Sequence, residues 1–111
     1  MTEQYVEGKT TMSLDVLVTI ASMAALGVEG VSRLIPVRGA RKSLFKGSQD
    51  GVRVTIEDDI VLVDLFLVMK DDVNIREVGR AVQQHVTRAI TEMTGMQVGL
   101  VNIHVEDIDL A

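Results

Sequence analysis

The chain has 111 residues, a length that suits a single domain spanning residues 1–111. With 47% hydrophobic and 24% charged residues it has enough apolar material for a core, which excludes a chain that stays unfolded throughout. It contains no cysteine, so disulfides and thiolate metal centres are excluded, and its net charge of −5 argues against a nucleic-acid coat.

The sequence shows no targeting or membrane-spanning segment. No apolar run reaches the roughly 18 residues needed to cross a bilayer, and the N-terminal residues 1–4 lack the basic and apolar regions of a signal peptide. We therefore expect a cytoplasmic chain with no transmembrane segment of its own.

The first two predicted elements are a weak edge strand over residues 4–10 and an apolar helix over residues 14–26. Ser13 is a suitable N-cap for this helix, and Gly27 marks its end because glycine tolerates the left-handed conformation. The helix is apolar almost all round, which indicates that it is buried on more than one side or covered by a partner.

A short strand over residues 31–35 is followed by a basic surface loop at residues 36–51, which begins with Pro36. Together with the preceding arginine, the loop forms what we call the basic patch: Arg33, Arg38, Arg41, Lys42 and Lys46. The rest of the chain keeps 6 of the 11 basic residues against 16 acidic ones, a balance of −10.

Two interpretations of the basic patch stay open, a solvated loop and a binding site for an anionic partner. Lipid headgroups, an acidic protein or nucleic acid would each suit such a site. Nucleic acid is disfavoured, because Phe45 is the loop's single aromatic residue for base stacking.

A β-hairpin is predicted next. Residues 52–57 alternate apolar and polar, Asp58 and Asp59 form a turn, and residues 60–69 are apolar at nine of ten positions. The second strand is therefore predicted to be central and packed on both faces.

The last predicted elements are a helix and a strand. Asn74 and Glu77 form a capping-box pattern at the start of an amphipathic helix that ends at Gly95, and a strand follows over residues 97–106. The order of elements predicts a two-layer α+β fold, β-α-β-β-α-β-like, with a small mixed β-sheet and two helices on one face. Ferredoxin-like connectivity is one candidate.

The sheet face opposite the helices is predicted to be too apolar to remain exposed to water. The candidate oligomer surface on that face comprises Leu62, Asp64, Phe66, Leu100, Asn102 and His104. Exposed apolar patches of this kind mark association surfaces, so we expect a homo-oligomer packed sheet to sheet or edge to edge.

Polar residues offer few candidates for chemistry. Asp64, isolated among apolar neighbours, needs a partner such as Asn102 or His104, either as an acid/base pair or as a structural contact. His104 also begins an acidic C-terminal stretch, which fits a solvated terminus or weak divalent-metal binding. His85 is interpreted as a surface residue, and the glycines of residues 27–30 as a helix stop and turn. We predict no catalytic residue, cofactor or metal site.

Several segments of the chain are similar to a known bacterial family. They are residues 12–21 (MSLDVLVTIA), 28–31 (VEGV), 60–69, 73–75 (VNI), 94–98 (TGMQV) and 101–108 (VNIHVEDI). In this order the chain resembles the alkaline shock protein twenty-three type envelope stress response family, departing from it at residues 70–72, where an aromatic-glycine turn is common.

The resemblance implies a small, oligomeric cytoplasmic protein with no established catalytic activity and no catalytic residues to transfer. Some members are held near the membrane by an anchoring protein, and others are tied to lipid metabolism. Two hypotheses follow. The first is a non-enzymatic envelope stress response scaffold that self-associates and binds a membrane-proximal partner. The second is a regulatory module that binds a lipid-metabolism enzyme or a nucleic acid.

Overall fold

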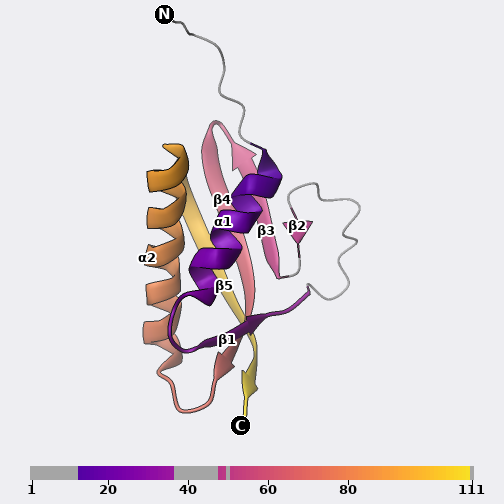
Figure 1. The fold of residues 1–111 in the computed structure, drawn as a ribbon, viewed down its shortest axis with the longest axis vertical. Helices are drawn as coiled ribbons and strands as arrows, with labels where there is room; N and C mark the ends of the chain where they lie inside the picture. The colour runs from indigo at the N-terminus through magenta and orange to yellow at the C-terminus, as the bar shows by residue number, and fades with distance from the viewer. Residues whose placement is uncertain (1–12, 37–47, 50, 111) are drawn as a thin grey trace, which may run out of the picture.

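The computed structural model describes residues 13–36, 48–49 and 51–110, so the predicted strand at 4–10 and most of the basic loop lie outside the described residues. The elements, in chain order, are α1 (Leu14–Leu26), β1 (Val31–Leu34), β2 (Ser48–Gln49), β3 (Val52–Glu57), β4 (Ile60–Lys70), α2 (Ile75–Thr94) and β5 (Gln97–Asp109). They form two layers, a mixed sheet with both helices on one side (Figure 1). The predicted α+β class is confirmed.

The sheet is built around β4. One edge of β4 pairs with β5 in parallel. The other edge pairs antiparallel with two strands, with β3 at residues 60–65 and with β1 at residues 67–69. The ferredoxin-like candidate is wrong, because there the strands joined through a helix are separated by another strand, whereas β4 and β5 are direct neighbours. A further difference is β2, a two-residue strand paired with β3 inside the segment predicted as loop.

The predicted bounds of α1 are confirmed, and its start is capped as expected. The Ser13 side chain accepts a hydrogen bond from the Asp15 backbone N–H at 3.2 Å. Gly27 is the C-cap but has a φ of −80°, so the predicted left-handed conformation is not used there. The helix packs against α2 on one side and against β1 and β3 on another, which explains its apolar sequence. Three of its apolar residues, Val16, Met23 and Leu26, remain exposed.

The turns and caps around the hairpin and α2 follow the sequence signals. Asp58 and Asp59, with φ of 52° and 66°, form the tight turn that joins β3 to β4. Asn74 Oδ1 accepts a hydrogen bond from the Glu77 backbone N–H at 3.1 Å, and Gly95 ends α2 in the left-handed conformation with a φ of 77°.

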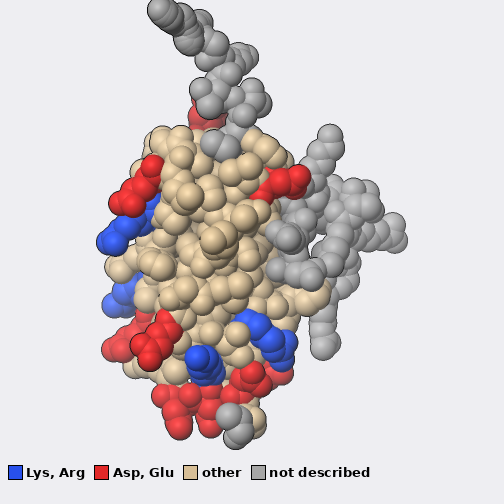
Figure 2. All heavy atoms as spheres, in the orientation of Figure 1, with Lys and Arg blue, Asp and Glu red and all other residues tan. Residues whose placement is uncertain are grey.

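The core lies between the sheet and the helices. Alternate residues of β4, namely Val61, Val63, Leu65, Leu67 and Met69, are buried there with Val52, Val54, Leu17, Ala21, Val82, Val86 and Ile90. At one end of this core, Gly30 packs closely against α2. It has a φ of 105°, and a Cβ at this position would lie 2.7 Å from the Val78 side chain. On the helix side, the surface over α1 is uncharged in its middle, and the charged side chains of the described residues gather at its margins (Figure 2).

A bulge at Gly99 interrupts the alternation of side chains along β5. Val61 pairs with Val98 but Leu62 pairs with Leu100, so the strand shifts by one residue between them. As a result Val98 packs against the core instead of sharing the face of Leu100. A Cβ at Gly99 would lie 2.6 Å from the Ile60 side chain, so a larger residue here would force Ile60 to move.

Candidate functional site

The sheet register brings together all six residues of the predicted oligomer surface. Leu62 pairs with Leu100, Asp64 with Asn102 and Phe66 with His104, and in each strand these residues alternate with core residues. They therefore share the sheet face that is turned away from the helices. We call this surface, defined by the same six residues, the open face.

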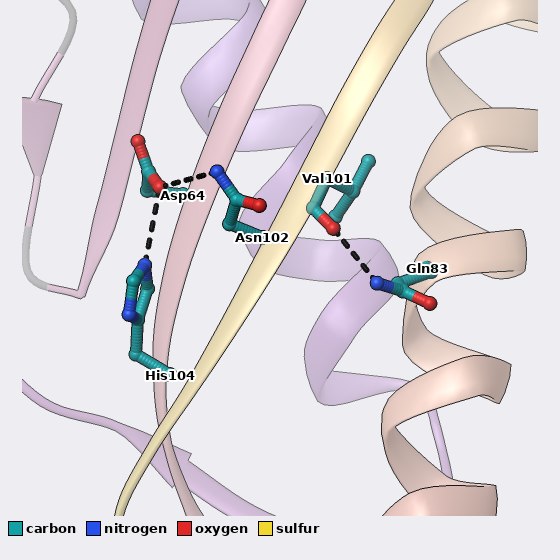
Figure 3. Close-up of polar contacts among 5 residues, drawn as sticks. All are labelled: Asp64, Gln83, Val101, Asn102 and His104. Atoms are coloured by element: carbon teal, nitrogen blue, oxygen red, sulfur yellow. Dashed lines mark hydrogen bonds and ion pairs between the residues drawn. The ribbon is translucent and has the colours of Figure 1, made fainter.

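The polar centre of the open face is the Asp64 carboxylate (Figure 3). Its Oδ1 accepts hydrogen bonds from Asn102 Nδ2 and from His104 Nε2, each at 3.1 Å. The side chains of His104 and Asp64 are 42% and 28% exposed, so both groups keep contact with solvent. One carboxylate oxygen thus holds two side chains of the neighbouring strand in place.

An aromatic stack lies beside this centre. The rings of Phe66 and His104 are stacked, with centroids 4.4 Å apart and planes inclined by 9°. The guanidinium carbon of Arg53 lies 5.6 Å from the Phe66 centroid, within the range of a cation–π contact. Arg53 was not among the predicted residues, although the alternation of β3 and its position opposite Asp64 place it on the same face.

The geometry shows the predicted contact of Asp64, which both of the expected partners, Asn102 and His104, make. The His104 ring has Nε2 bonded to Asp64 and one face stacked against Phe66, so both contacts restrain its orientation. Contacts within one chain therefore hold Asp64, Asn102 and His104 together.

The apolar part of the open face is incompletely covered. Leu100 is 51% exposed, and Leu62 and Phe66 are half-buried. The prediction that β4 is packed on both faces is therefore corrected for residues 62–66, whose outward side chains the described residues cover only in part, whereas Val68 further along the strand is buried. A partner on the open face would remove the remaining apolar area from water.

The other predicted polar sites are dispersed. Arg33 is exposed on β1, opposite Val68, while the four other residues of the basic patch lie outside the described residues. In the C-terminal stretch, Asp109 Oδ2 accepts a hydrogen bond from Ser32 Oγ at 2.6 Å. The part of the chain that the structure describes contains no group of three or more potential metal ligands.

His85 joins the two helices. Its Nδ1 donates a hydrogen bond to the Ala24 carbonyl oxygen near the end of α1, at 2.9 Å.

Neither of the two described helices is both long and apolar enough to cross a membrane.

Comparison with known proteins gives a match over nearly the whole chain. The profile of the alkaline shock protein twenty-three family, described as having a cell envelope-related function, matches residues 2–110. An uncharacterised protein of Bacillus subtilis, YqhY, is 29% identical over 104 residues, which cover 91% of this chain and 77% of that protein. The uncharacterised Streptococcus pyogenes protein Spy1614 is 28% identical over 107 residues, covering 92% and 88%. No solved structure gives a significant match.

Proposed function

Because the chain belongs to the alkaline shock protein twenty-three family, whose function is related to the cell envelope, we propose that it is a non-enzymatic envelope stress response scaffold. In this proposal the chain self-associates through the open face. It also binds a membrane-proximal partner, such as an anchoring protein, at the inner face of the cell membrane.

The observation that carries the proposal is the construction of the open face. Apolar Leu62 and Leu100 lie beside a polar cluster in which Asp64 already accepts hydrogen bonds from both neighbours. A surface of this kind can be buried at little cost, because the polar groups that enter the interface are hydrogen-bonded beforehand.

The basic patch supports the second half of the proposal. Arg33 is exposed, and the sequence concentrates four further cations between residues 38 and 46 of an otherwise acidic chain. Such a charge distribution favours an anionic partner and orients the chain as it approaches.

The self-association is tested with Leu100→Glu. Leu100 is half-exposed in the single chain, so the fold should tolerate the change, but a carboxylate at this position would be buried without a partner in the assembly. Light scattering at micromolar concentration should show a smaller particle than for the wild-type chain. The matched control is Met93→Glu, which is 70% exposed on α2 and should leave the particle size unchanged. A strictly monomeric wild-type chain would contradict the proposal.

The partner is tested by crosslinking and capture from native cells. A chain with Arg38, Arg41, Lys42 and Lys46 changed to glutamate is compared with the wild type. A membrane-anchoring protein that is captured by the wild type and lost with the variant is the expected result. Capture of a lipid-metabolism enzyme or of RNA in its place would support the regulatory module instead.

A further inference from the structure

The outer edge of β5 is a second candidate surface, separate from the open face. Among the described strands β5 pairs only with β4, which leaves one edge of a 13-residue strand without a strand partner. At this edge Gln83 of α2 donates its Nε2 to the Val101 carbonyl oxygen at 2.9 Å (Figure 3). Because backbone groups alternate in direction along a strand, those of Ile103 and Val105 point the same way as those of Val101.

A groove between α2 and this edge gives access to those backbone groups. Ile103 and Val105 line it on the β5 side, and Arg76, Gly79 and Arg80 line it on the α2 side. We call it the edge groove.

Gly79 widens the edge groove without being required by the single chain. It lies in the interior of α2, where glycine costs helix stability, yet a Cβ added there would meet nothing within 4 Å. Packing among the described residues therefore does not explain this glycine. The space that it leaves is open to the backbone of another segment.

The charges along the edge groove are complementary to those at the end of β5. Among the described residues no salt bridge is formed by Arg76 or Arg80, and both are exposed on the wall of the groove. The C-terminal part of β5 carries Glu106 and Asp107, also exposed. The strand contains neither lysine nor proline, which commonly protect an exposed edge from pairing.

We propose that the edge groove receives the same edge of a second copy of the chain. The two β5 strands pair antiparallel about a two-fold axis near residues 103–105, so that the two sheets become continuous. In this arrangement the acidic end of each β5 lies level with the turn of α2 that carries Arg80 of the other copy, and the two contacts are equivalent by symmetry. The pairing extends the self-association proposed above to a second surface and does not depend on the open face.

The cysteine-free sequence allows a direct test by site-specific crosslinking. Single cysteines replace Ile103, His104, Val105 or Glu106 in the full chain, with Thr91→Cys on the exposed surface of α2 as the control. All of these variants carry Leu100→Glu, so that the open face, to which His104 belongs, does not contribute to the crosslinking. Directly opposite residues of antiparallel strands have Cα atoms about 4.5–5.5 Å apart, which permits a disulfide. Mild oxidation should produce covalent dimers at one or more of the four positions and none at Thr91. Monomers at all four positions, or equal dimers at Thr91, would overturn the proposal.

Filling the groove provides a second test with a built-in control for folding. Gly79→Leu places a side chain where the second copy would lie, and should reduce dimer formation in the best crosslinking variant by about tenfold, equivalent to roughly 1.4 kcal/mol. Gly79→Leu should not lower the midpoint of thermal unfolding, because the groove is open in the single chain. Unchanged crosslinking with Gly79→Leu would contradict the proposal, whatever the behaviour of Leu100→Glu.

A charge exchange tests the orientation of the pair. Arg80→Glu should weaken crosslinking, and the combination of Arg80→Glu with Glu106→Arg should restore it, because the attraction is then reversed in both copies. A combination that stays as weak as Arg80→Glu would reject the antiparallel arrangement. An edge groove that binds an acidic peptide from another protein, with no crosslinked dimer, would likewise overturn the proposal.

Discussion

Asp64 shows how a single residue can organise a surface. Its Oδ1 accepts two hydrogen bonds from β5, and one of the donors, His104, is held further by the stack on Phe66. We expect Asp64→Ala to lower the free energy of unfolding by about 1 kcal/mol, since both donors lose their acceptor but stay close to water. Urea unfolding measures the change, with Asn102→Ala as the comparison that removes one bond. An equal or larger loss for Asn102→Ala would show that Asp64 is not the centre of the cluster.

Two glycines are expected to respond in opposite directions to the same substitution. Gly30 has a φ of 105° and faces Val78, so Gly30→Ala should destabilise the chain by about 1–3 kcal/mol through backbone strain and overlap. Gly79→Ala should stabilise it by about 0.5–1 kcal/mol, because alanine favours the helix and meets nothing there. Thermal unfolding of both variants gives the signs. A loss for Gly79→Ala would show that its surroundings are tighter than described.

At the scale of elements, the start of α2 depends on one side chain. Asn74 Oδ1 accepts the Glu77 backbone N–H, which otherwise has no partner within the helix. Asn74→Ala should cost about 1 kcal/mol, whereas Asn74→Asp should cost little, because aspartate caps equally well and its charge suits the helix N-terminus. Urea unfolding compares the two variants. Equal losses would mean that a feature other than the cap determines the stability at this position.

The helices and the hairpin were predicted from the sequence, because residues close together in the chain determine them. Both helices follow from a cap, an apolar pattern and a final glycine, and the hairpin follows from two alternating strands around Asp58 and Asp59. The exact register of β4 with β5 and the bulge at Gly99 were not predicted, because they depend on contacts between distant segments. Gly27 also differs, because the left-handed turn expected there occurs at Gly30.

The candidate site was predictable to a similar extent. Alternation along β4 and β5 predicts that Asp64, Asn102 and His104 share one face, and the register of the two strands agrees with this. The stack of Phe66 on His104 and the position of Arg53 depend on side-chain conformations that no spacing specifies. Sequence alone also gives no sign of the edge groove, because it exists only once α2 lies beside β5.

At the scale of the whole molecule, the open face and the edge groove lie on different parts of the sheet. The open face is formed by the side of β4 and β5 turned away from the helices, and the edge groove lies between the outer edge of β5 and α2. Two symmetric contacts at separate surfaces link more than two copies, whereas either one alone gives a dimer.

This separation predicts a defined series of assemblies. The wild-type chain should form particles larger than a dimer, Leu100→Glu and Gly79→Leu should each reduce them to dimers, and the double variant should be a monomer. Sedimentation velocity at several concentrations distinguishes these species, and circular dichroism checks that each variant is folded. Because the two substituted residues lie on separate surfaces, their effects on association should add. If either single variant is already a monomer, only one of the two surfaces associates, and the crosslinking at β5 then shows which one.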